Sequence, residues 1–494
     1  MYLRLCLALF AAFLVYRVMR WFMWLRKLKK ALADVPVMDE PHWLFGNIRQ
    51  IRAMGGFVEA RAAAFDKLGI GTMKVYLGPI PIIVTRDIDL FKYIHNNQSN
   101  SATPFIRVDA PMLNRVVGDS ALLVTDGDVW AFHRKNLDPL FHRQNLSGVY
   151  PKVVEHCQRL ERLWLEECCK NSITKAADIF VDDQLRSFAT GMIAYVAFST
   201  DLGVLKTNDI HPMVQRFTDI AKSMESLGMF PPIMQKISWL PERRLLEREV
   251  AKTDQEMLKT IQMRRVGTAS VEDYRDVLDL LLNADVSPPY TDRCIRDQCI
   301  TLYWAGQETT SLFMTWGLYY LAHHPNVQQT LFEALQDLPE AYTYEQLSRI
   351  NYLTYFVNET LRLASVAPST VKQSSTDVTA YQGLQLPAGL WLLSSIHDIQ
   401  HHPDYFPDPL KFDPDRWTDP KRHSMDAFVA FTKGEKVCIG QKLALMVGKT
   451  FFAYVVPKFQ FTEAPGFEVA AKKTFVCRPK NGMKLRISVR RDSV

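Results

Sequence analysis

Cys438 lies in a stretch whose residue types suit a metal ligand, FTKGEKVCIG, residues 431–440. Gly434 and Gly440 give the backbone freedom on either side of it. A helix beginning at about Gly440 would direct its positive end at a thiolate, and Phe431 can cover the sulfur. Because no second cysteine or histidine is close in the sequence, one thiolate here fits haem iron better than zinc or an iron–sulfur cluster. A cysteine that only packs is the alternative.

A second stretch with reactive side chains is AGQETT, residues 305–310. Glycine inside a helix costs about 1 kcal/mol relative to alanine, so Gly306 predicts a local opening of the helix that contains it. Glu308 and Thr309 are two adjacent polar residues in the same segment. The alternative is an ordinary polar pair on a helix surface.

Two pairs of side chains have helical spacing. Glu359 and Arg362 are three residues apart, and Trp130 and Arg134 are four apart, so each pair shares one face of a helix. Taken alone, the first is a common surface ion pair and the second an amphipathic helix with a core tryptophan. Arg416, in FDPDRW, is a further arginine before the cysteine stretch.

The elements that must position these residues are mostly helical. Apolar spacing predicts helices over residues 292–323, 352–363 and 440–456, the first stopped by Pro325. The β signals are fewer. Residues 72–85 predict two strands joined at Gly78-Pro79, and residues 473–489 predict a second hairpin. The expected fold is one mainly α domain with a minor β part.

Composition narrows the class of protein. The chain of 494 residues is 48% hydrophobic and 23% charged, which is ordinary for a globular protein. Its net charge is +6, but residues 1–33 contain seven basic and no acidic residues, so the remainder carries a net charge of −1. This distribution argues against nucleic-acid binding. Eight cysteines without CxxC spacing argue against a disulfide scaffold or a structural zinc site.

The N-terminus predicts an uncleaved membrane anchor over residues 1–30. Its apolar run extends from Leu5 to Leu25 if the arginines within it reach the interfaces. The basic cluster at residues 26–30 would keep the following chain on the cytosolic side. An amphipathic helix lying in the interface and a mitochondrial presequence are the alternatives. Prolines and a glycine predict a linker over residues 31–50, before a domain over residues 51–494.

The motifs, in this order along the chain, resemble those of the cytochrome P-450 family. The haem-binding signature of that family reads Phe-x-x-Gly-x-Arg-x-Cys-x-Gly, with an alanine four residues later. The present chain differs at Lys436, where the family usually has arginine or histidine. Lysine can pair with a haem propionate as a point charge but not as a bidentate fork. The five matching positions are Phe431, Gly434, Cys438, Gly440 and Ala444.

The resemblance implies a role for each motif around haem b, within a triangular single domain crossed by a long central helix. Cys438 would be the iron ligand. The residues implied to hold the haem propionates are Trp130, Arg134, Lys436 and Lys372. A buried structural triad is implied for Glu359, Arg362 and Arg416. The residues implied to hold dioxygen and relay protons to it are Ala305, Gly306, Glu308 and Thr309.

The activity implied by the resemblance is a monooxygenase that uses O2 to hydroxylate a lipophilic substrate, with a sterol or fatty acid favoured. Electrons would come from the NADPH–cytochrome P-450 reductase, with cytochrome b5 as a second donor, at the endoplasmic reticulum membrane facing the cytosol. One alternative is a haem-thiolate isomerase or dehydratase of peroxides, which needs no reductase, and another is a non-catalytic haem sensor. The expected pocket segments are residues 102–118, 224–230, 299–305, 365–371 and 475–476. The expected basic docking face comprises Lys135, Arg143, Lys433, Lys436 and Lys442.

Overall fold

The computed structural model describes residues 2–96, 104–108, 110–207, 209–228, 237–267, 276–287, 289–339 and 341–490. The chain divides into two compact units. Unit 1 comprises residues Met1–Val108, Ser369–Ile399 and Lys433–Glu435, and unit 2 comprises Asp109–Pro368, Gln400–Thr432 and Lys436–Val494. The two expected pocket segments 102–118 and 224–230 lie partly outside the described residues.

Unit 1 is built on a five-stranded sheet of order β1-β2-β8-β5-β3. The predicted hairpin of residues 72–85 is confirmed, because β1 and β2 pair antiparallel from Thr72↔Thr85 to Leu77↔Ile80. Gly78 adopts a φ of 64° in the connecting turn, a conformation that favours glycine. The strands of this sheet are β1 (Thr72–Leu77), β2 (Ile80–Thr85), β3 (Phe105–Arg107), β5 (Thr370–Ser374) and β8 (Trp391–Ser394).

The remaining elements of unit 1 are helices and a short two-stranded sheet. The helices are α1 (Tyr2–Ala31), α2 (Ile48–Ala53), α3 (Phe57–Leu68), α4 (Ile88–Asn96), α17 (Ile396–Gln400, whose last residue belongs to unit 2) and the 3₁₀ turn η2 (Tyr381–Gly383). The short sheet pairs β6 (Val378–Thr379) with β7 (Gln385–Leu386).

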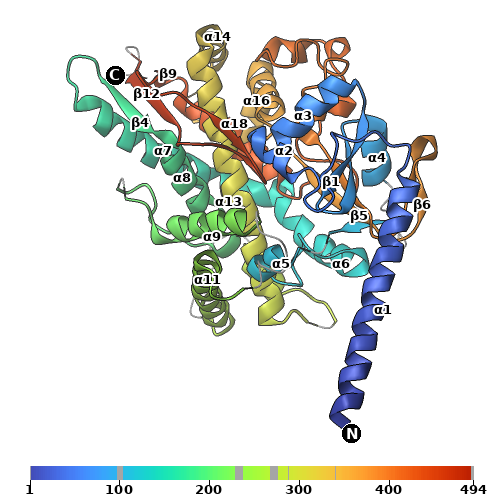
Figure 1. Ribbon diagram of the computed structural model, residues 1–494. Helices are drawn as coiled ribbons and strands as arrows, with labels where there is room; N and C mark the ends of the chain where they lie inside the picture. The colour runs from blue at the N-terminus through green and yellow to red at the C-terminus, as the bar shows by residue number, and fades with distance from the viewer. Residues whose placement is uncertain are drawn as a thin grey trace. The chain divides into compact units, whose positions relative to one another are not determined.

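The first helix, α1, is drawn in dark blue in Figure 1. Its segment Arg4–Ala31 is long and apolar enough to cross a membrane. Its last turn is different, because Leu28 is fully buried and Lys27 pairs with Asp377 at 2.5 Å. Trp24 also donates from its indole nitrogen to the carbonyl oxygen of Ala388, at 2.9 Å. The helix is therefore fastened at its C-terminal end to the rest of unit 1.

The predicted linker, residues 31–50, is hydrogen-bonded to β1. The Lys74 amide donates to the Pro36 carbonyl oxygen at 2.7 Å, and the Met38 amide donates to the Lys74 carbonyl oxygen at 3.0 Å. Asn47 accepts from the Tyr76 amide at 2.8 Å. This segment is thus part of the folded unit, while the boundaries at residues 30 and 50 stay predictions.

Unit 2 is mainly helical. Its longest helix, α13 (Asp292–His323), has the predicted bounds: the Thr291 hydroxyl caps its start by accepting from the Cys294 amide, and Pro325 opens the next helix. In Figure 1 it is the long yellow helix, with α8 (Val181–Phe198) and α18 (Gln441–Val455) packed against it. The predicted helices 352–363 and 440–456 are confirmed as α16 (Asn351–Ala364) and α18.

The close approach of α13 and α18 depends on two glycines. A Cβ atom on Gly448 of α18 would lie 2.1 Å from the ring of Phe313, and one on Gly317 of α13 would lie 2.2 Å from the ring of Phe452. The two rings meet edge to face with centroids 5.8 Å apart. Each helix therefore supplies one glycine and one phenylalanine to the contact, which lets the backbones lie close together.

The other helices of unit 2 complete its core. They are α5 (Pro111–Val117), α6 (Gly127–Leu137), α7 (Arg143–Cys169), α9 (Pro212–Gly228), α11 (Pro241–Arg265), α12 (Val277–Leu282), α14 (Pro325–Leu335) and α15 (Tyr344–Ser348). The 3₁₀ turns are η1 (Asp138–Phe141), η3 (Pro414–Thr418), η4 (Pro420–Arg422) and η5 (Met425–Ala427).

The predicted second hairpin, residues 473–489, is wrong as a single unit. β11 (Cys477–Pro479) pairs with β10 (Ala471–Lys473), whereas β12 (Lys484–Val489) lies between β4 (Ala176–Phe180) and β9 (Phe459–Glu463). The apolar alternation of β12 is satisfied by these two distant strands rather than by β11. Short strands next to Gly482 imitate a hairpin in the sequence.

Candidate functional site

The backbone around Cys438 turns tightly before α18. The Cys438 amide donates to the Phe431 carbonyl oxygen at 3.1 Å, and the Gln441 amide donates to the Cys438 carbonyl oxygen at 3.4 Å. Burial raises the pKa of the Cys438 thiol, while the amides of Gly440 and Gln441 and the charge of Arg134 act in the opposite direction. Ligation by a metal favours the thiolate and releases this proton.

The two glycines of the cysteine stretch have different structural reasons. Gly434 adopts a φ of 78°, and a Cβ atom there would lie 2.1 Å from the His95 carbonyl oxygen, so only glycine fits. Gly440 has an ordinary φ of −82°, and the predicted conformational freedom is therefore wrong for this position. A Cβ atom on Gly440 would lie 3.9 Å from the Cys438 sulfur. The Ala444 amide donates to the Gly440 carbonyl oxygen within the first turn of α18.

Helix α6 brings Trp130 and Arg134 to the cysteine stretch. Arg134 donates to the Val437 carbonyl oxygen at 2.8 Å. Lys436 forms an ion pair with Asp126, and its ammonium nitrogen lies 5.4 Å from the centre of the Trp130 ring. The lysine that replaces the usual arginine thus has a protein carboxylate as a partner, which the sequence reasoning did not anticipate.

Lys372 lies in β5 of unit 1, opposite Arg107 of β3. Its side chain is buried, and burial together with the like charge of Arg107 lowers the pKa of Lys372 to about 7. Among the described residues no carboxylate pairs with it. A buried amine beside a second cation fits an acidic group of a bound ligand.

The AGQETT segment remains α-helical throughout α13. A Cβ atom on Gly306 would lie 2.8 Å from Ile193 of α8, so the structure explains this glycine by helix packing. The predicted local opening is therefore wrong for this structure. Thr309 donates its hydroxyl to the Ala305 carbonyl oxygen at 2.7 Å, and Ala305 is exposed although α13 is buried on either side of the segment.

Glu308 has a partner that the sequence did not predict. Arg478, in β11, places a guanidinium nitrogen 3.4 Å from a Glu308 carboxylate oxygen. The two residues are 170 positions apart, and Arg478 belongs to no recognised motif. The local signal is weak: Arg478 follows the buried Cys477 in a strand, where successive side chains point to opposite faces.

Glu359, Arg362 and Arg416 are brought together and fully buried. One Glu359 oxygen lies 2.8 Å from Arg362 and 3.0 Å from Arg416, and the other accepts from the indole of Trp417 at 3.0 Å. Arg362 also donates to the carbonyl oxygen of Gln400, at 2.8 Å. This ion-pair network therefore holds α16 to the irregular chain that leads to the cysteine stretch.

Unit 1 contains a second buried ion pair. Arg61 of α3 donates to Asp398 at 2.8 Å and to the Ser369 hydroxyl at 2.6 Å. Ser395 and His397 contact the same carboxylate, at 2.6 and 3.0 Å. Burial alone would raise the pKa of Asp398, but Arg61 and these hydrogen bonds hold it well below its usual range. No sequence pattern had indicated this pair.

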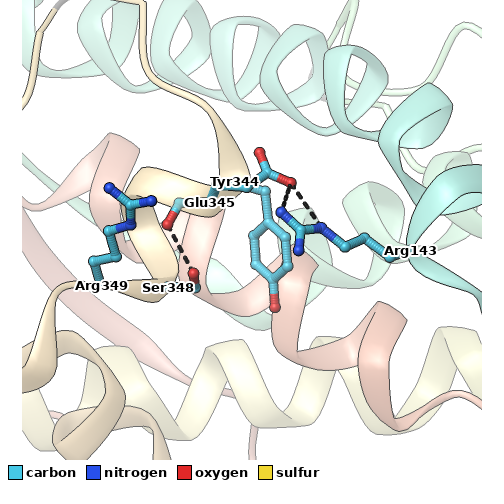
Figure 2. A pocket seen from close by; sticks show the side chains of 5 residues that line it. All are labelled: Arg143, Tyr344, Glu345, Ser348 and Arg349. Carbon is cyan, nitrogen blue, oxygen red and sulfur yellow. Dashed lines mark hydrogen bonds and ion pairs between the residues drawn. The ribbon is translucent and has the colours of Figure 1, made fainter.

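A hollow on unit 2 contains none of the expected catalytic or haem-binding residues. Figure 2 shows it between the start of α7 and α15, lined by Arg143, Tyr344, Glu345, Ser348 and Arg349. Arg143 donates to a Glu345 carboxylate oxygen at 2.9 Å. This member of the expected docking face is thus already ion-paired. Lys436 cannot belong to that face, because its side chain is 6% exposed and paired with Asp126.

The donor set fits a metal that takes one ligand from the protein. Among the described residues, no group of three or more histidine, cysteine or acidic side chains could hold a metal ion. The side chain of Cys438 is accessible, as is that of Ala305 in α13. Basic and indole side chains lie beside the thiol-bearing loop. These features suit iron held in a flat organic ring with acidic substituents.

A mainly helical fold with such a cysteine before its last long helix defines a haem-thiolate protein. The chain belongs to the cytochrome P450 family, whose model matches residues 36–486. Members of this family are monooxygenases that use thiolate-ligated haem b and O2. The predictions of family, fold class, enzyme class and cofactor are thereby confirmed.

The relatives cover nearly the whole chain at low identity. Cytochrome P450 4X1 of Homo sapiens is 26% identical, over 93% of this chain and 92% of the relative. A protein of Sus scrofa named taurochenodeoxycholic 6 alpha-hydroxylase is 25% identical, with the same two coverages. The solved cytochrome P450DA heme domain has a TM-score of 0.80 and 21% identity, and the alignment covers 92% of this chain and 97% of that domain.

Proposed function

We propose that this protein is a membrane-attached monooxygenase that hydroxylates a C–H bond of a lipophilic substrate, a sterol or a fatty acid. The overall reaction converts RH, O2, NADPH and a proton into ROH, water and NADP⁺. A flavin-containing NADPH reductase would deliver the two electrons. The observation that carries the proposal is that one chain of this family combines the Cys438 loop with an accessible α13 segment bearing Glu308 and Thr309.

When bound, the haem would supply oxygen activation, and residues of the chain would hold it in place. Cys438 would ligate the iron. Trp130, Arg134, Lys436 and Lys372 would hold the propionates, with Lys436 sharing its charge with Asp126. Lys372 needs an anion for its charged form to be favoured at neutral pH, because burial lowers its pKa to about 7.

Proton delivery is assigned to α13. The Thr309 hydroxyl donates to the Ala305 carbonyl oxygen and can turn from it to a ligand on the exposed side of the helix. Glu308 would supply protons to this position. Such a relay serves O2 reduction to water, whereas a peroxide isomerase or dehydratase has no need of it. The intact pair therefore favours the monooxygenase over that alternative.

Two observations support a lipid as the substrate. The chain begins with a helix long and apolar enough to lie in or across a membrane, where lipids are concentrated. One relative is named for hydroxylating taurochenodeoxycholic acid, which is a steroid with an acidic headgroup. A sterol or a fatty acid is an amphiphile of the same general kind.

The membrane-anchor helix supports the proposal for the electron donor. A cytosol-facing protein of the endoplasmic reticulum would take electrons from the NADPH–cytochrome P450 reductase, with cytochrome b5 as a second donor. Lys135 and Lys442 are exposed and suit an acidic docking partner. Exchanging both for glutamine is expected to slow reduction and weaken its dependence on salt, while Arg143, which is paired with Glu345, contributes less.

The test compares the full chain with Cys438→Ser. After reduction and addition of carbon monoxide, the wild type is expected to show the red-shifted Soret band of a thiolate ligand, and the variant is expected to lose it. The wild type is then supplied with reductase, NADPH and either dodecanoic acid or cholesterol. A hydroxylated product supports the proposal. Conversion of a fatty-acid hydroperoxide without reductase, and no product with NADPH, would favour the isomerase or dehydratase.

A further inference from the structure

Glu308 is the end of a chain of alternating charges in unit 2. Lys472 of β10 lies 2.5 Å from one oxygen of Glu225 in α9, and Arg478 of β11 lies 3.8 Å from the other. A second guanidinium nitrogen of Arg478 lies 3.4 Å from Glu308. The order Lys472, Glu225, Arg478, Glu308 thus joins α9, the β10–β11 hairpin and α13.

The backbone that carries Arg478 is fixed on both sides. The neighbouring Cys477 donates its amide to the Val366 carbonyl oxygen at 2.8 Å and accepts from the indole of Trp316 at 2.9 Å. Trp316 belongs to α13, about two turns after Glu308. The guanidinium therefore reaches Glu308 from a strand whose position is set by the same helix.

The charges of the hairpin would repel one another without Glu225. Lys472 and Arg478 are directly opposed in the antiparallel register of β10 and β11, and opposed like charges destabilise a strand pair. Glu225 lies within ion-pair distance of both. A movement of α9 that withdraws Glu225 would leave Glu308 as the one acidic partner of Arg478 among the residues that the structure describes.

Arg478 also has an unused donor. Its Nε atom is buried and makes no hydrogen bond within the described part of the chain, so the guanidinium is not fully satisfied by its partners there. A buried donor without a partner favours rearrangements that supply one. A small change in the position of either carboxylate would alter how the Arg478 guanidinium divides its ion pairing between Glu225 and Glu308.

We infer that Arg478 is a positioning residue for proton delivery, which orients the Glu308 carboxylate and links its orientation to the position of α9 through Glu225. The inference rests on the proposed function, in which Glu308 supplies protons. Met224, beside Glu225, belongs to a segment expected to line the substrate pocket. Substrate bound against α9 would therefore change the orientation of the Glu308 carboxylate before O2 is reduced.

The test measures how consumed O2 is divided between products. Productive turnover reduces O2 to one hydroxyl and one water, whereas failed proton delivery releases H2O2 from O2, two electrons and two protons. Arg478→Gln is expected to give about tenfold less product per O2 consumed and a larger solvent isotope effect. This is less than the roughly hundredfold or greater cost of losing a general acid, because Glu308 itself is retained. Arg478→Lys should recover part of the loss, because it keeps the charge.

The matched control is Lys472→Gln, which removes a cation from the same hairpin that contacts Glu225 but not Glu308. It is expected to leave the H2O2 fraction near that of the wild type. Both substitutions are expected to speed hydrogen exchange in peptides from residues 212–228, measured on the haem-loaded full chain. Retention of the thiolate–carbon monoxide band establishes that each variant is folded. If Arg478→Gln does not fold, Arg478→Lys is measured in its place.

The inference is overturned if the H2O2 fraction and the solvent isotope effect of the Arg478 variants match those of the wild type. It is also overturned if Lys472→Gln raises the H2O2 fraction as much as Arg478→Gln does, because the hairpin rather than the Glu308 contact would then be responsible. Failure of the proposed substrate looks different. The wild type would then make H2O2 but no product from dodecanoic acid or cholesterol, and the H2O2 comparison between variants would still decide the role of Arg478.

Discussion

Glu359 in unit 2 and Asp398 in unit 1 are both buried carboxylates held by arginine, but they are held differently. Glu359 is shared by two buried arginines and an indole, with an amide of the Pro/Asp-rich chain as a further donor. Asp398 has one arginine, and its other contacts come from Ser395 and His397 in its own turn. The first network joins α16 to the irregular chain before the cysteine stretch, whereas the second joins α3 to the turn at residues 395–398 and, through Arg61, to Ser369.

The difference shows where a buried charge is structurally indispensable. Removal of Glu359 would leave two buried arginines without a counter-charge, and removal of Asp398 would leave one. Both arginines of the first network also donate to backbone carbonyl oxygens before the cysteine stretch, such as those of Pro409 and Pro407. The loop that presents Cys438 therefore depends on the first network more than on the second.

The largest effect is expected when each carboxylate is neutralised in turn, which tests directly whether the two networks contribute unequally to stability. Glu359→Gln is expected to reduce the free energy of unfolding by about 3–5 kcal/mol, and Asp398→Asn by less, because fewer charges lose their partner. The thiolate–carbon monoxide band and circular dichroism would be followed during urea unfolding. Arg486→Gln, which breaks a surface ion pair with Asp178, is the control and should leave the urea midpoint close to that of the wild type.

Equal losses for Glu359→Gln and Asp398→Asn would contradict this ranking. It would also be contradicted if Glu359→Gln retained the wild-type yield of the thiolate–carbon monoxide band. In that case the backbone hydrogen bonds of Arg362 and Arg416 alone would hold the cysteine loop.

The second prediction concerns a smaller effect, the pH dependence of the stability loss at the Asp398 site of unit 1. Arg61→Met removes the arginine that pairs with Asp398 and is expected to cost about 3 kcal/mol at pH 8, the lower end of the range for breaking a buried ion pair. In the wild type the pKa of Asp398 is held low, so its contribution is present above the unfolded pKa and is lost only in strong acid. In the variant, burial raises this pKa, and the carboxyl can take a proton as the pH falls. The stability loss should therefore shrink between pH 8 and pH 5.

The measurement is urea unfolding of wild type and Arg61→Met at both pH values. A loss that stays constant or grows toward pH 5 would mean that Asp398 remains charged without Arg61. His397 and Ser395 would then be sufficient to hold the carboxylate.

The two networks also differ in how far the sequence predicts them. Glu359 and Arg362 are adjacent on one face of α16, and the resemblance to the family supplied Arg416. Arg61 and Asp398 are 337 positions apart. Arg61 has no acidic residue, and Asp398 no lysine or arginine, three or four positions away that would indicate an ion pair. Local periodicity predicts pairs within one element, whereas pairs between distant elements depend on how the chain folds.

The same limit applies to the fold and to the candidate site. The bounds of α13 follow from a capping threonine and a proline, which act locally. The place of β12 depends on strands at residues 176–180 and 459–463, and no local signal indicates them. Arg478 reaches Glu308 through that same C-terminal part of the chain, which explains why the sequence reasoning found the acid and missed its cation.

The finest way to sharpen the comparison removes one neutral donor from each carboxylate. Ser395→Ala deletes a 2.6 Å hydrogen bond to Asp398, and Trp417→Phe deletes a 3.0 Å hydrogen bond to Glu359. Each is expected to cost about 1.5–3 kcal/mol, the range for a hydrogen bond to a charged group. Ser395→Ala is expected to cost more in the Arg61→Met background than in the wild type. Of the three described side chains that contact the Asp398 carboxylate, His397 alone then remains. Additive losses in this double-mutant cycle would show that the contacts of Asp398 act independently, and that the carboxylate is less dependent on Arg61 than their buried ion pair implies.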